Sequence, residues 1–383
     1  MTRTDVVFTF PVETMFDDAV KREFCRSPDQ MLLTLARDDR VGTLLAADAW
    51  RSLPISLARR RPYRLSEPIT IAGRPAVRVR PHRLRRADST DLGRVEVAYR
   101  AYAQRLGTAL ARSRGEPTPG PGSAALITYH PFVAAFCAAA WIRNVVYVGQ
   151  DDWATGDPLR PWWELYREAY RRIDERRAAI FAVSAELASR ISPRGVVAAN
   201  GVSAQVWNPR RPAPPRIEAL ARPRAIYAGT IDDRLDRGLV ERTARAVGSF
   251  VLIGHPGDAN TIRWLRSVEG IHVFGTVSQQ KLAATIQACD VGVLPHRDHP
   301  CTRAMSPLKL YEYLAAGLPV VSVDLPPVHG VDDRVLICGR EDWPMTLQRA
   351  LATGRASETR RLRFIADASW EKRLRPVVEA TVS

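Results

Sequence analysis

The stretch SPLKLYEYLAAGLPVVSV, residues Ser306–Val323, predicts a helix with both ends marked that runs straight into a buried strand. Ser306 suits the N-cap, and Pro307 suits the first helical position, where its missing N–H costs nothing. Gly317 can adopt the left-handed conformation that ends a helix, and Pro319 prevents the helix from restarting. The apolar run that follows is typical of a parallel strand covered on both faces, and it comprises Val320, Val321 and Val323.

The polar side of this helix has the residue types that bind a diphosphate. At 100° per residue, Ser306, Lys309 and Glu312 share one face. The free N–H groups of the first turn and a lysine suit phosphate oxygens, and a carboxylate one turn deeper suits a ribose. An ordinary amphipathic helix with a wet polar face is the alternative. Composition argues against it, because arginine supplies almost all positive charge and the only lysines are Lys21, Lys281, Lys309 and Lys372.

These residues resemble the signature of nucleotide-sugar glycosyltransferases of the GT-B fold, the superfamily that includes glycosyltransferase family 4 and the group 1 glycosyl transferases. The resemblance implies that the helix N-terminus at Ser306 and nearby basic residues such as Lys309 hold the donor diphosphate. It also implies that Glu312 hydrogen-bonds the ribose hydroxyls. Many retaining members carry a further glutamate eight residues earlier, where this chain has Ala304. Retention of anomeric configuration is therefore not implied here.

Length and composition predict two domains. The chain has 383 residues and is 46% hydrophobic, which is enough for two cores of ordinary size. The longest apolar run, Phe132–Ile142, predicts a helix through Trp141 and is too short to span a bilayer. Nothing at the N-terminus resembles a signal peptide, and the five cysteines lack CxxC spacing, which indicates reduced thiols and no structural zinc. We therefore expect a cytoplasmic protein.

The formal charge of +15 has two interpretations. An Arg-rich composition can reflect genomic base bias, or the charge can attract a polyanion such as nucleic acid or an anionic membrane. Much of the excess lies between Arg59 and Arg114, where no RRM, zinc-finger or basic-zipper pattern occurs. We expect no nucleic-acid partner. Peripheral association with the inner face of an anionic membrane is expected if the acceptor is a lipid-linked glycan.

Two predicted strands in the first half deliver side chains that could do chemistry. The run Ala124–Tyr129 leads to His130, and the run Asn144–Val148 leads to Asp151 and Asp152. Because ligands gather outside the carboxyl ends of parallel strands, each of these three residues is a candidate base or sugar contact. A satisfied strand-end histidine and a capping or loop carboxylate are the alternatives. An Asp pair also suggests the metal-binding motif of the GT-A architecture, but the later elements favour a second doubly wound half.

From Ala225 onward, short strands alternate with helices, and each strand ends in glycine or a polar residue. This alternation predicts a parallel sheet with ligand-facing loops. Asn200-Gly201 resembles the segment where the chain of such enzymes leaves the first domain, and we expect Arg210–Arg222 to be a linker. The residues that we expect near the donor phosphates or base, partly through the resemblance, are Gly229, Thr230, Arg234, His255, Thr276 and Val277.

The predicted fold is α/β of the GT-B type, with two Rossmann-like doubly wound domains facing a cleft. The expected boundaries are 1–205 for an acceptor-binding domain and 206–365 for a donor-binding domain. Residues 366–383 are expected to form a C-terminal helix that packs back on the first domain.

The predicted function is transfer of a sugar from a nucleoside-diphosphate donor to an acceptor hydroxyl, without a metal or a cofactor. The reaction needs diphosphate charge neutralised, an acceptor oxygen positioned and, in the inverting case, a base. The helix start that meets the first need comprises Ser306, Pro307, Leu308 and Lys309. We expect a UDP-, GDP- or other nucleotide-linked sugar as donor, and a glycan, lipid-linked glycan or small molecule as acceptor. A nucleotide-sugar epimerase of the same fold and a non-catalytic basic binding protein are the alternatives.

Overall fold

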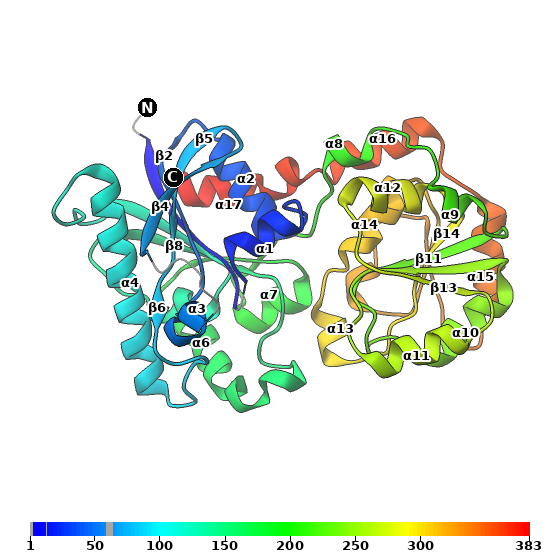
Figure 1. The fold of residues 1–383 in the computed structure, drawn as a ribbon, viewed down its shortest axis with the longest axis horizontal. Helices are drawn as coiled ribbons and strands as arrows, with labels where there is room; N and C mark the ends of the chain where they lie inside the picture. Colours follow the sequence, from blue (N-terminus) through cyan, green and yellow to red (C-terminus); the bar gives the residue numbers. More distant parts are fainter. Residues whose placement is uncertain (1–2, 13, 59–63) are drawn as a thin grey trace. The chain divides into compact units, whose positions relative to one another are not determined.

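The chain forms two compact units in a computed structural model that describes residues 3–12, 14–58 and 64–383, apart from the side chain of residue 157. Residues 1–199 and 374–383 make up the first unit, and residues 200–373 make up the second. Each unit is a sheet of mostly parallel strands with helices packed on it (Figure 1). The prediction of an α/β fold with two Rossmann-like domains is confirmed.

The first unit is built on an eight-stranded sheet of order β10-β9-β8-β7-β1-β2-β5-β4. All neighbouring strands are parallel except the edge strand β4, which pairs antiparallel with β5. Its strands are β1 (Thr4–Thr9), β2 (Val41–Ala47), β4 (Ser66–Ile71), β5 (Arg74–Val79), β7 (Ala124–Thr128), β8 (Ile142–Gly149), β9 (Ala179–Ala182) and β10 (Val196–Val197), and a separate short pair joins β3 (Arg51–Ser52) to β6 (His82–Arg83).

Helices cover this sheet and bury its apolar strands. The longest, α4 (Leu92–Arg114), begins at the Asp91 cap and ends at Gly115 in the left-handed conformation. Its buried face, which includes Tyr102 and Leu106, joins the strand side chains in one core. The other helices of this unit are α1 (Phe16–Lys21), α2 (Ser27–Arg37), α3 (Leu53–Ala58), α5 (Pro131–Phe136), the 3₁₀ turn η1 (Asp157–Trp162), α6 (Trp163–Glu175) and α7 (Ala185–Ile191).

Helix α5 is shorter than the sequence predicts. The expected helix extends to Trp141, but α5 ends at Phe136, and Cys137 is already extended. Arg176 lies across this end and donates from Nη1 to the carbonyl oxygens of Ala134 (2.5 Å) and Cys137 (3.1 Å). The half-buried guanidinium of Arg176 thus satisfies carbonyl groups that a longer helix would have satisfied.

The last ten residues group with the first unit. All of them except Ser383 belong to helix α17 (Trp370–Val382), and they make specific contacts with this unit. Asn144 Nδ2 donates to the carbonyl of Ala380 (2.9 Å), and Arg40 pairs with Glu379 (2.8 Å). The C-terminal segment is therefore part of the first unit's packing.

The second unit is built on a six-stranded sheet of order β13-β12-β11-β14-β15-β16, in which all neighbours are parallel. The reversal of strand order beside β11 is the topological switch point at which open α/β sheets bind ligands. The strands are β11 (Arg224–Ala228), β12 (Ser249–Ile253), β13 (Ile271–Phe274), β14 (Val291–Leu294), β15 (Val320–Ser322) and β16 (Val335–Ile337).

Helices lie on both faces of this sheet, with α12 and α14 on one side and α10 and α11 on the other (Figure 1). Trp343 and Leu239 pack with the strands in a core beneath α10 and α15. The helices are α8 (Ala204–Trp207), α9 (Pro215–Glu218), α10 (Arg237–Ala246), α11 (Ala259–Ser267), α12 (Gln279–Gln287), α13 (Pro300–Ala304), α14 (Leu308–Ala315), η2 (Pro326–Val328), α15 (Trp343–Thr353) and α16 (Glu358–Asp367).

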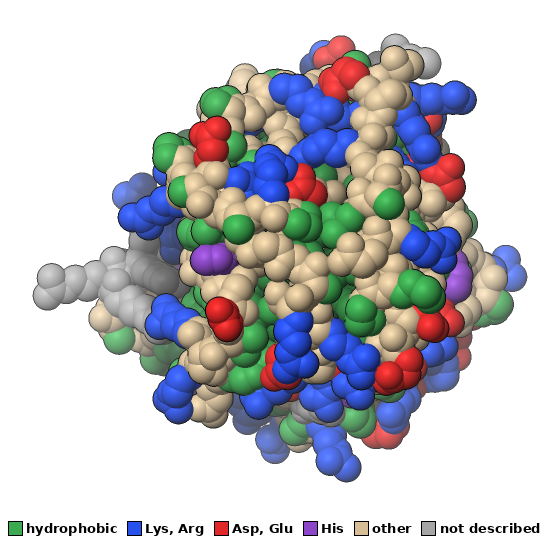
Figure 2. Space-filling model, turned by 90° about the vertical axis from the view of Figure 1, so that its right-hand side faces the viewer, with side chains coloured by type: hydrophobic (Ala, Val, Ile, Leu, Met, Phe, Trp, Pro, Cys, Tyr) green, Lys and Arg blue, Asp and Glu red, His purple; other side chains and the backbone are tan. Residues whose placement is uncertain are grey.

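Positive charge is dispersed on the face drawn in Figure 2. Lys and Arg side chains occur there at several separate places, with Asp and Glu side chains among them. Many arginines are engaged in ion pairs, for example Arg334 with Asp332 (2.8 Å). Across the described part of the chain, no helix combines the length and the apolar character needed to cross a membrane.

Candidate functional site

The site forms where the loops after β11 and β12 meet, and two glycines allow this approach. Gly229 (φ 141°) and Gly254 (φ 149°) follow these strands in conformations that other residues rarely adopt. The loops are tied by backbone hydrogen bonds from Gly229 N to Ile253 O (2.9 Å) and from Ile231 N to His255 O (2.9 Å). The half-buried backbone of Gly229 thereby lies next to Lys309 at the start of α14.

Helix α14 begins one residue later than the sequence predicts. Pro307 is the N-cap and makes no side-chain capping bond. Ser306 lies outside the helix; its Oγ is buried without a partner in the described structure, and its carbonyl accepts from Asn200 Nδ2 (2.7 Å). Pro307, with an extended backbone (φ −71°, ψ 107°), takes the N-cap position that Ser306 was expected to hold. The prediction that Ser306 is the N-cap is therefore wrong.

The other end of α14 follows the prediction. Gly317 has φ 85°, and its N–H bonds the carbonyl of Leu314 (3.0 Å). Leu318 N bonds Tyr313 O (3.0 Å), which completes a Schellman motif before β15. The helix that carries the candidate diphosphate and ribose residues is thus fixed between two rigid ends.

Lys309 lies at the centre of the site. Its Nζ is 3.2 Å from the Tyr227 hydroxyl, 4.5 Å from the centre of the Tyr227 ring and 3.5 Å from His296 Nε2. A Cβ atom on Gly229 would come within 2.8 Å of Lys309 Cε, so this lysine rests on the glycine backbone. Burial, with a contribution from the positive charge of Arg234, lowers the pKa of Lys309 to about 7. An arriving anion would favour its charged form.

Arg234 lies on the same loop and is held by Asp232. Its guanidinium donates to both carboxylate oxygens of Asp232 at 2.8–3.1 Å through Nε and one Nη. Its carbonyl accepts from Arg297 N (2.8 Å), which links the loop to the segment after β14. Arg234 is near enough to Lys309 to lower the pKa of that lysine, so two cationic side chains lie close together here.

Glu312 lies one turn beyond Lys309 on α14. Burial raises the pKa of its carboxyl group to about 7, and the charge of Lys309 opposes this shift. Within the described residues, no hydrogen bond or ion pair engages the Glu312 side chain. A half-buried carboxyl group with open acceptor positions could bind ligand hydroxyls.

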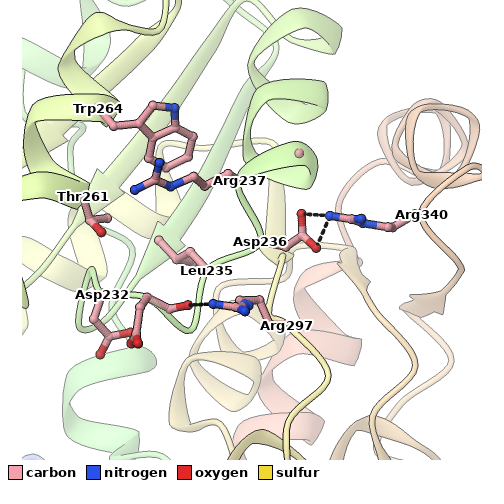
Figure 3. Close-up of a pocket in the computed structure, with 10 residues that line it drawn as sticks. Asp232, Leu235, Asp236, Arg237, Thr261, Trp264, Arg297 and Arg340 are labelled. Atoms are coloured by element: carbon pink, nitrogen blue, oxygen red, sulfur yellow. Dashed lines mark hydrogen bonds and ion pairs between the residues drawn. The ribbon is translucent and has the colours of Figure 1, made fainter.

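A hollow of about 360 Å³ opens beside the loop that holds Arg234 (Figure 3). The Arg237 guanidinium lies under the Trp264 ring, 4.9 Å from its centre, on one side. Arg340 pairs with Asp236 (2.5 Å) on the other. The hollow shares Asp232 with the Lys309 site, and its further lining residues are Asp233, Leu235, Gly238, Thr261 and Arg297.

The remaining predicted donor residues are more scattered. Thr230 joins the Lys309 cluster, because its carbonyl accepts from the Tyr227 hydroxyl (3.0 Å). His255, Thr276 and Val277 are exposed at the ends of β12 and β13, and the structure does not bring their side chains onto Lys309. Pro307 is buried at the start of α14, next to Leu308, which is partly exposed.

Tyr227, Asp232 and His296 belong to the site but were not among the predicted site residues. His296 is 2% exposed and follows β14 by two residues. Its position after a predicted strand was the one signal in the sequence, since polar residues there face the ligand side of a parallel sheet. Tyr227 lies inside β11 and gave no such signal.

In the first unit, His130 is a buried capping residue. Its Nδ1 accepts from Phe132 N at the start of α5 (3.2 Å), and its Nε2 is 3.0 Å from the Tyr99 hydroxyl. Burial lowers the pKa of His130 to about 4. Both ring nitrogens are therefore engaged within the first unit.

The two aspartates after β8 differ in exposure. Asp152 is 8% exposed, pairs with Arg190 (2.5 Å) and accepts from Ala154 N (3.1 Å). Asp151 is exposed. His130 thus has the surroundings of a satisfied strand-end histidine, and Asp152 has those of a loop carboxylate. Asp151 is the most accessible of the three candidate bases.

No group of three His, Cys, Asp or Glu side chains that could hold a metal ion occurs in the parts of the chain described. Ala304, at the place of the glutamate found in many retaining enzymes, is 1% exposed in α13 and offers no polar group.

Solved structures of other proteins share this fold. The structure is similar over its whole length to α,α-trehalose 6-phosphate synthase from Burkholderia multivorans, with a TM-score of 0.66, 14% identity and 100% and 98% of the two chains covered. It is also similar to HepE of Anabaena in complex with UDP-glucose, with a TM-score of 0.58, 13% identity and 98% and 99% covered. At such identities these likenesses show the fold, which is GT-B.

The family match concerns the second unit. Residues 234–354 match the family model described as glycosyl transferases group 1, so the predicted resemblance is confirmed. TuaH of Bacillus subtilis (strain 168), provisionally assigned as a glycosyltransferase of teichuronic acid biosynthesis, is 29% identical over 134 residues. That alignment covers 33% of this chain and 34% of TuaH, about a third of each.

Proposed function

We propose that this chain is a glycosyltransferase that moves a sugar from a nucleoside-diphosphate donor to an acceptor hydroxyl without a metal ion. The observation that carries the proposal is the placement of Lys309. Its ammonium group lies at the start of α14, beside the backbone of Gly229 and near Arg234. Two cationic side chains and the first N–H groups of a helix at a topological switch point suit a diphosphate.

The chemistry follows from charge. As the bond between sugar and diphosphate breaks, negative charge develops on the leaving oxygens. Lys309, Arg234 and the first amides of α14 stabilise that charge, which is the role that a divalent cation has in other transferases. Because these groups are fixed before the reaction, little reorganisation is needed as the charge forms.

The nucleoside lies on the far side of the diphosphate from the sugar. Glu312 accepts hydrogen bonds from the ribose hydroxyls, and the exposed segment at Thr276-Val277 borders the base. UDP-sugars are the first donors to test, because the structure of HepE contains UDP-glucose, and GDP-sugars are the second.

The acceptor is a glycan, a lipid-linked glycan or a small molecule with a free hydroxyl. The assignment of TuaH to teichuronic acid biosynthesis favours a glycan acceptor. The net charge of +15 would assist peripheral contact with an anionic membrane surface, where lipid-linked acceptors reside.

The experiment is a donor and acceptor screen that measures released nucleotide. UDP- and GDP-sugars are first ranked by the rise in Tm that each causes. Release of UDP or GDP is then measured with and without acceptor, and donor hydrolysis is subtracted. Acceptor-dependent release supports the transferase. Conversion of the donor without nucleotide release indicates an epimerase, and binding without turnover under all conditions indicates a binding protein.

A further inference from the structure

His296 is a buried imidazole in direct contact with the proposed phosphate-binding lysine. It is 2% exposed, and its ring stands edge-on to the Tyr227 ring, with 5.7 Å between centres and 77° between planes. Its Nε2 lies 3.4 Å from the Tyr227 hydroxyl and 3.5 Å from Lys309 Nζ. The Tyr227 hydroxyl donates to the carbonyl of Thr230, so it can act as an acceptor toward Lys309.

The partners of the Lys309 ammonium group are uncharged. It touches the Tyr227 ring, the Tyr227 hydroxyl and His296 Nε2, and within the described ranges no ion pair to a carboxylate engages it. The nearby carboxylate of Asp232 is instead bound to Arg234. Lys372 provides a contrast, because it pairs with Asp367 at 2.7 Å.

We propose that His296 is a positioning residue for donor binding: as a neutral imidazole it accepts from Lys309 through Nε2, pins the Tyr227 ring beneath that lysine and keeps its charge uncompensated for the donor diphosphate. This inference rests on the proposed function, because it assigns the diphosphate as the anion that Lys309 awaits.

A carboxylate at position 296 could not position Lys309 and also leave its charge uncompensated. It would pair with Lys309, and the diphosphate would then have to displace a charge-assisted hydrogen bond before it could bind. A protonated imidazole would repel Lys309. The imidazole is suitable only while it is neutral, and in that form an accepting Nε2 places the ring proton on Nδ1.

The surroundings favour the neutral form. Burial, together with the charges of Lys309 and Arg234, keeps the pKa of His296 well below its usual range. The other charged groups near the cluster are Glu312 on α14, one turn from Lys309, and Asp232, which Arg234 neutralises. Nδ1 is buried without a protein partner in the described structure, so no carboxylate holds a second proton on the ring.

The test uses the intact protein and inorganic pyrophosphate, UDP and GDP as probes, titrated by calorimetry between pH 6 and 9. His296→Leu keeps apolar volume but removes the acceptor, and His296→Gln keeps an uncharged acceptor oxygen. His272→Leu on β13, away from the Lys309 cluster, is the control. Each variant is compared with the wild type at the same pH, so the titration of the probes themselves cancels.

We expect His296→Leu to bind pyrophosphate roughly 5–10-fold more weakly, as the loss of one hydrogen bond implies. We also expect the alkaline decline of its affinity to begin at lower pH, because the Lys309 ammonium has lost an acceptor. His296→Gln should restore most of the affinity, and His272→Leu should leave both affinity and pH profile unchanged.

Wild-type affinity and pH profile in His296→Leu would overturn the positioning role and leave the transferase proposal standing. Equal losses in His296→Leu and His296→Gln, with equally lowered Tm, would also overturn it, since packing alone would explain them. If the wild type bound none of the three probes, the proposed function and this inference would fail together.

Discussion

The carbonyl oxygen of Gly229 occupies the space that a Cβ atom on Gly254 would need. Both glycines have positive φ, and both follow neighbouring parallel strands, β11 and β12. The two backbones can approach this closely only because Gly254 has no side chain. This contact sets the position of Gly229, on which Lys309 rests.

Gly254→Ala should therefore distort the loop that supports Lys309. The backbone conformation alone costs about 1–3 kcal/mol for a residue with a Cβ, and the clash with Gly229 adds to this cost. We expect a lowered Tm and weaker binding of UDP or GDP, measured by differential scanning and by calorimetry. Gly275→Ala is the matched control, because open space surrounds that position. Equal behaviour of the two variants would show that the loop adapts.

Lys309→Met should weaken donor binding strongly at pH 7. A charge-assisted hydrogen bond to phosphate is worth about 1.5–3 kcal/mol, which corresponds to roughly 10–150-fold in the dissociation constant. Lys281→Met on α12 removes an exposed lysine and controls for the loss of one charge. A similar small effect in both variants would mean that Lys309 contributes only to the overall field of the protein.

Glu312→Gln should weaken donor binding, but it should stabilise the donor-free protein at high pH. The folded-state pKa of Glu312, about 7, lies above its ordinary value of 4.5, so the folded protein holds this proton more tightly than the unfolded chain. That stabilisation is fully present below pH 4.5 and is lost as the pH rises through about 7. The glutamine amide does not ionise. The Tm of Glu312→Gln should therefore exceed that of the wild type at pH 8 and approach it at pH 5.

The protonation of Glu312 and Lys309 also predicts how donor affinity depends on pH. The Glu312 carboxylate is the better ribose acceptor, so wild-type affinity should fall below pH 7, and this acid limb should vanish in Glu312→Gln. The alkaline limb, which reports Lys309, should remain in that variant. An unchanged acid limb would remove Glu312 from the ribose site.

Local sequence signals were sufficient to predict the second unit in outline. The Gly317 stop, the Val320–Val321 strand and the alternation of strands with helices follow from residue preferences over a few positions, and the structure has them. The start of α14 was placed wrongly, because Ser306 and Pro307 are both good at helix starts and local preference cannot rank them.

The part of the site that sequence analysis missed depends on long-range contacts. Tyr227 and Lys309 are 82 positions apart, and their contact exists only because β11 and α14 are neighbours in the folded unit. The early end of α5 has the same origin, since Arg176 reaches it from the end of α6. A side chain that acts through a distant partner has no local pattern.

Sugar transfer should continue in excess EDTA. The charge of the leaving diphosphate is assigned to Lys309, Arg234 and the amides of α14, so chelation should leave the rate of nucleotide release unchanged. The assay is the acceptor-dependent release of UDP or GDP, with and without EDTA. Complete loss of turnover that manganese restores would contradict the proposed charge neutralisation.

The last prediction concerns the three candidate bases of the first unit. His130→Ala should chiefly lower the Tm, because both ring nitrogens of His130 have partners and its loss leaves the Phe132 N–H unsatisfied in a buried place, at about 1–3 kcal/mol. Asp152→Asn should behave similarly, since it weakens the pair with Arg190. Arg190→Met is its control and should reproduce the same loss of Tm if the pair is structural.

Asp151→Asn should behave differently if Asp151 is the base. Turnover should fall roughly 10²–10⁴-fold while Tm and the dissociation constant of the donor stay close to those of the wild type. Asp151 is the candidate because it is exposed, and a base must reach the acceptor hydroxyl. A raised donor dissociation constant would instead indicate a sugar contact. Near-normal turnover in all three variants would mean that none of these residues is the base, which a retaining reaction would allow. The proposed donor site in the second unit would be unaffected by that result.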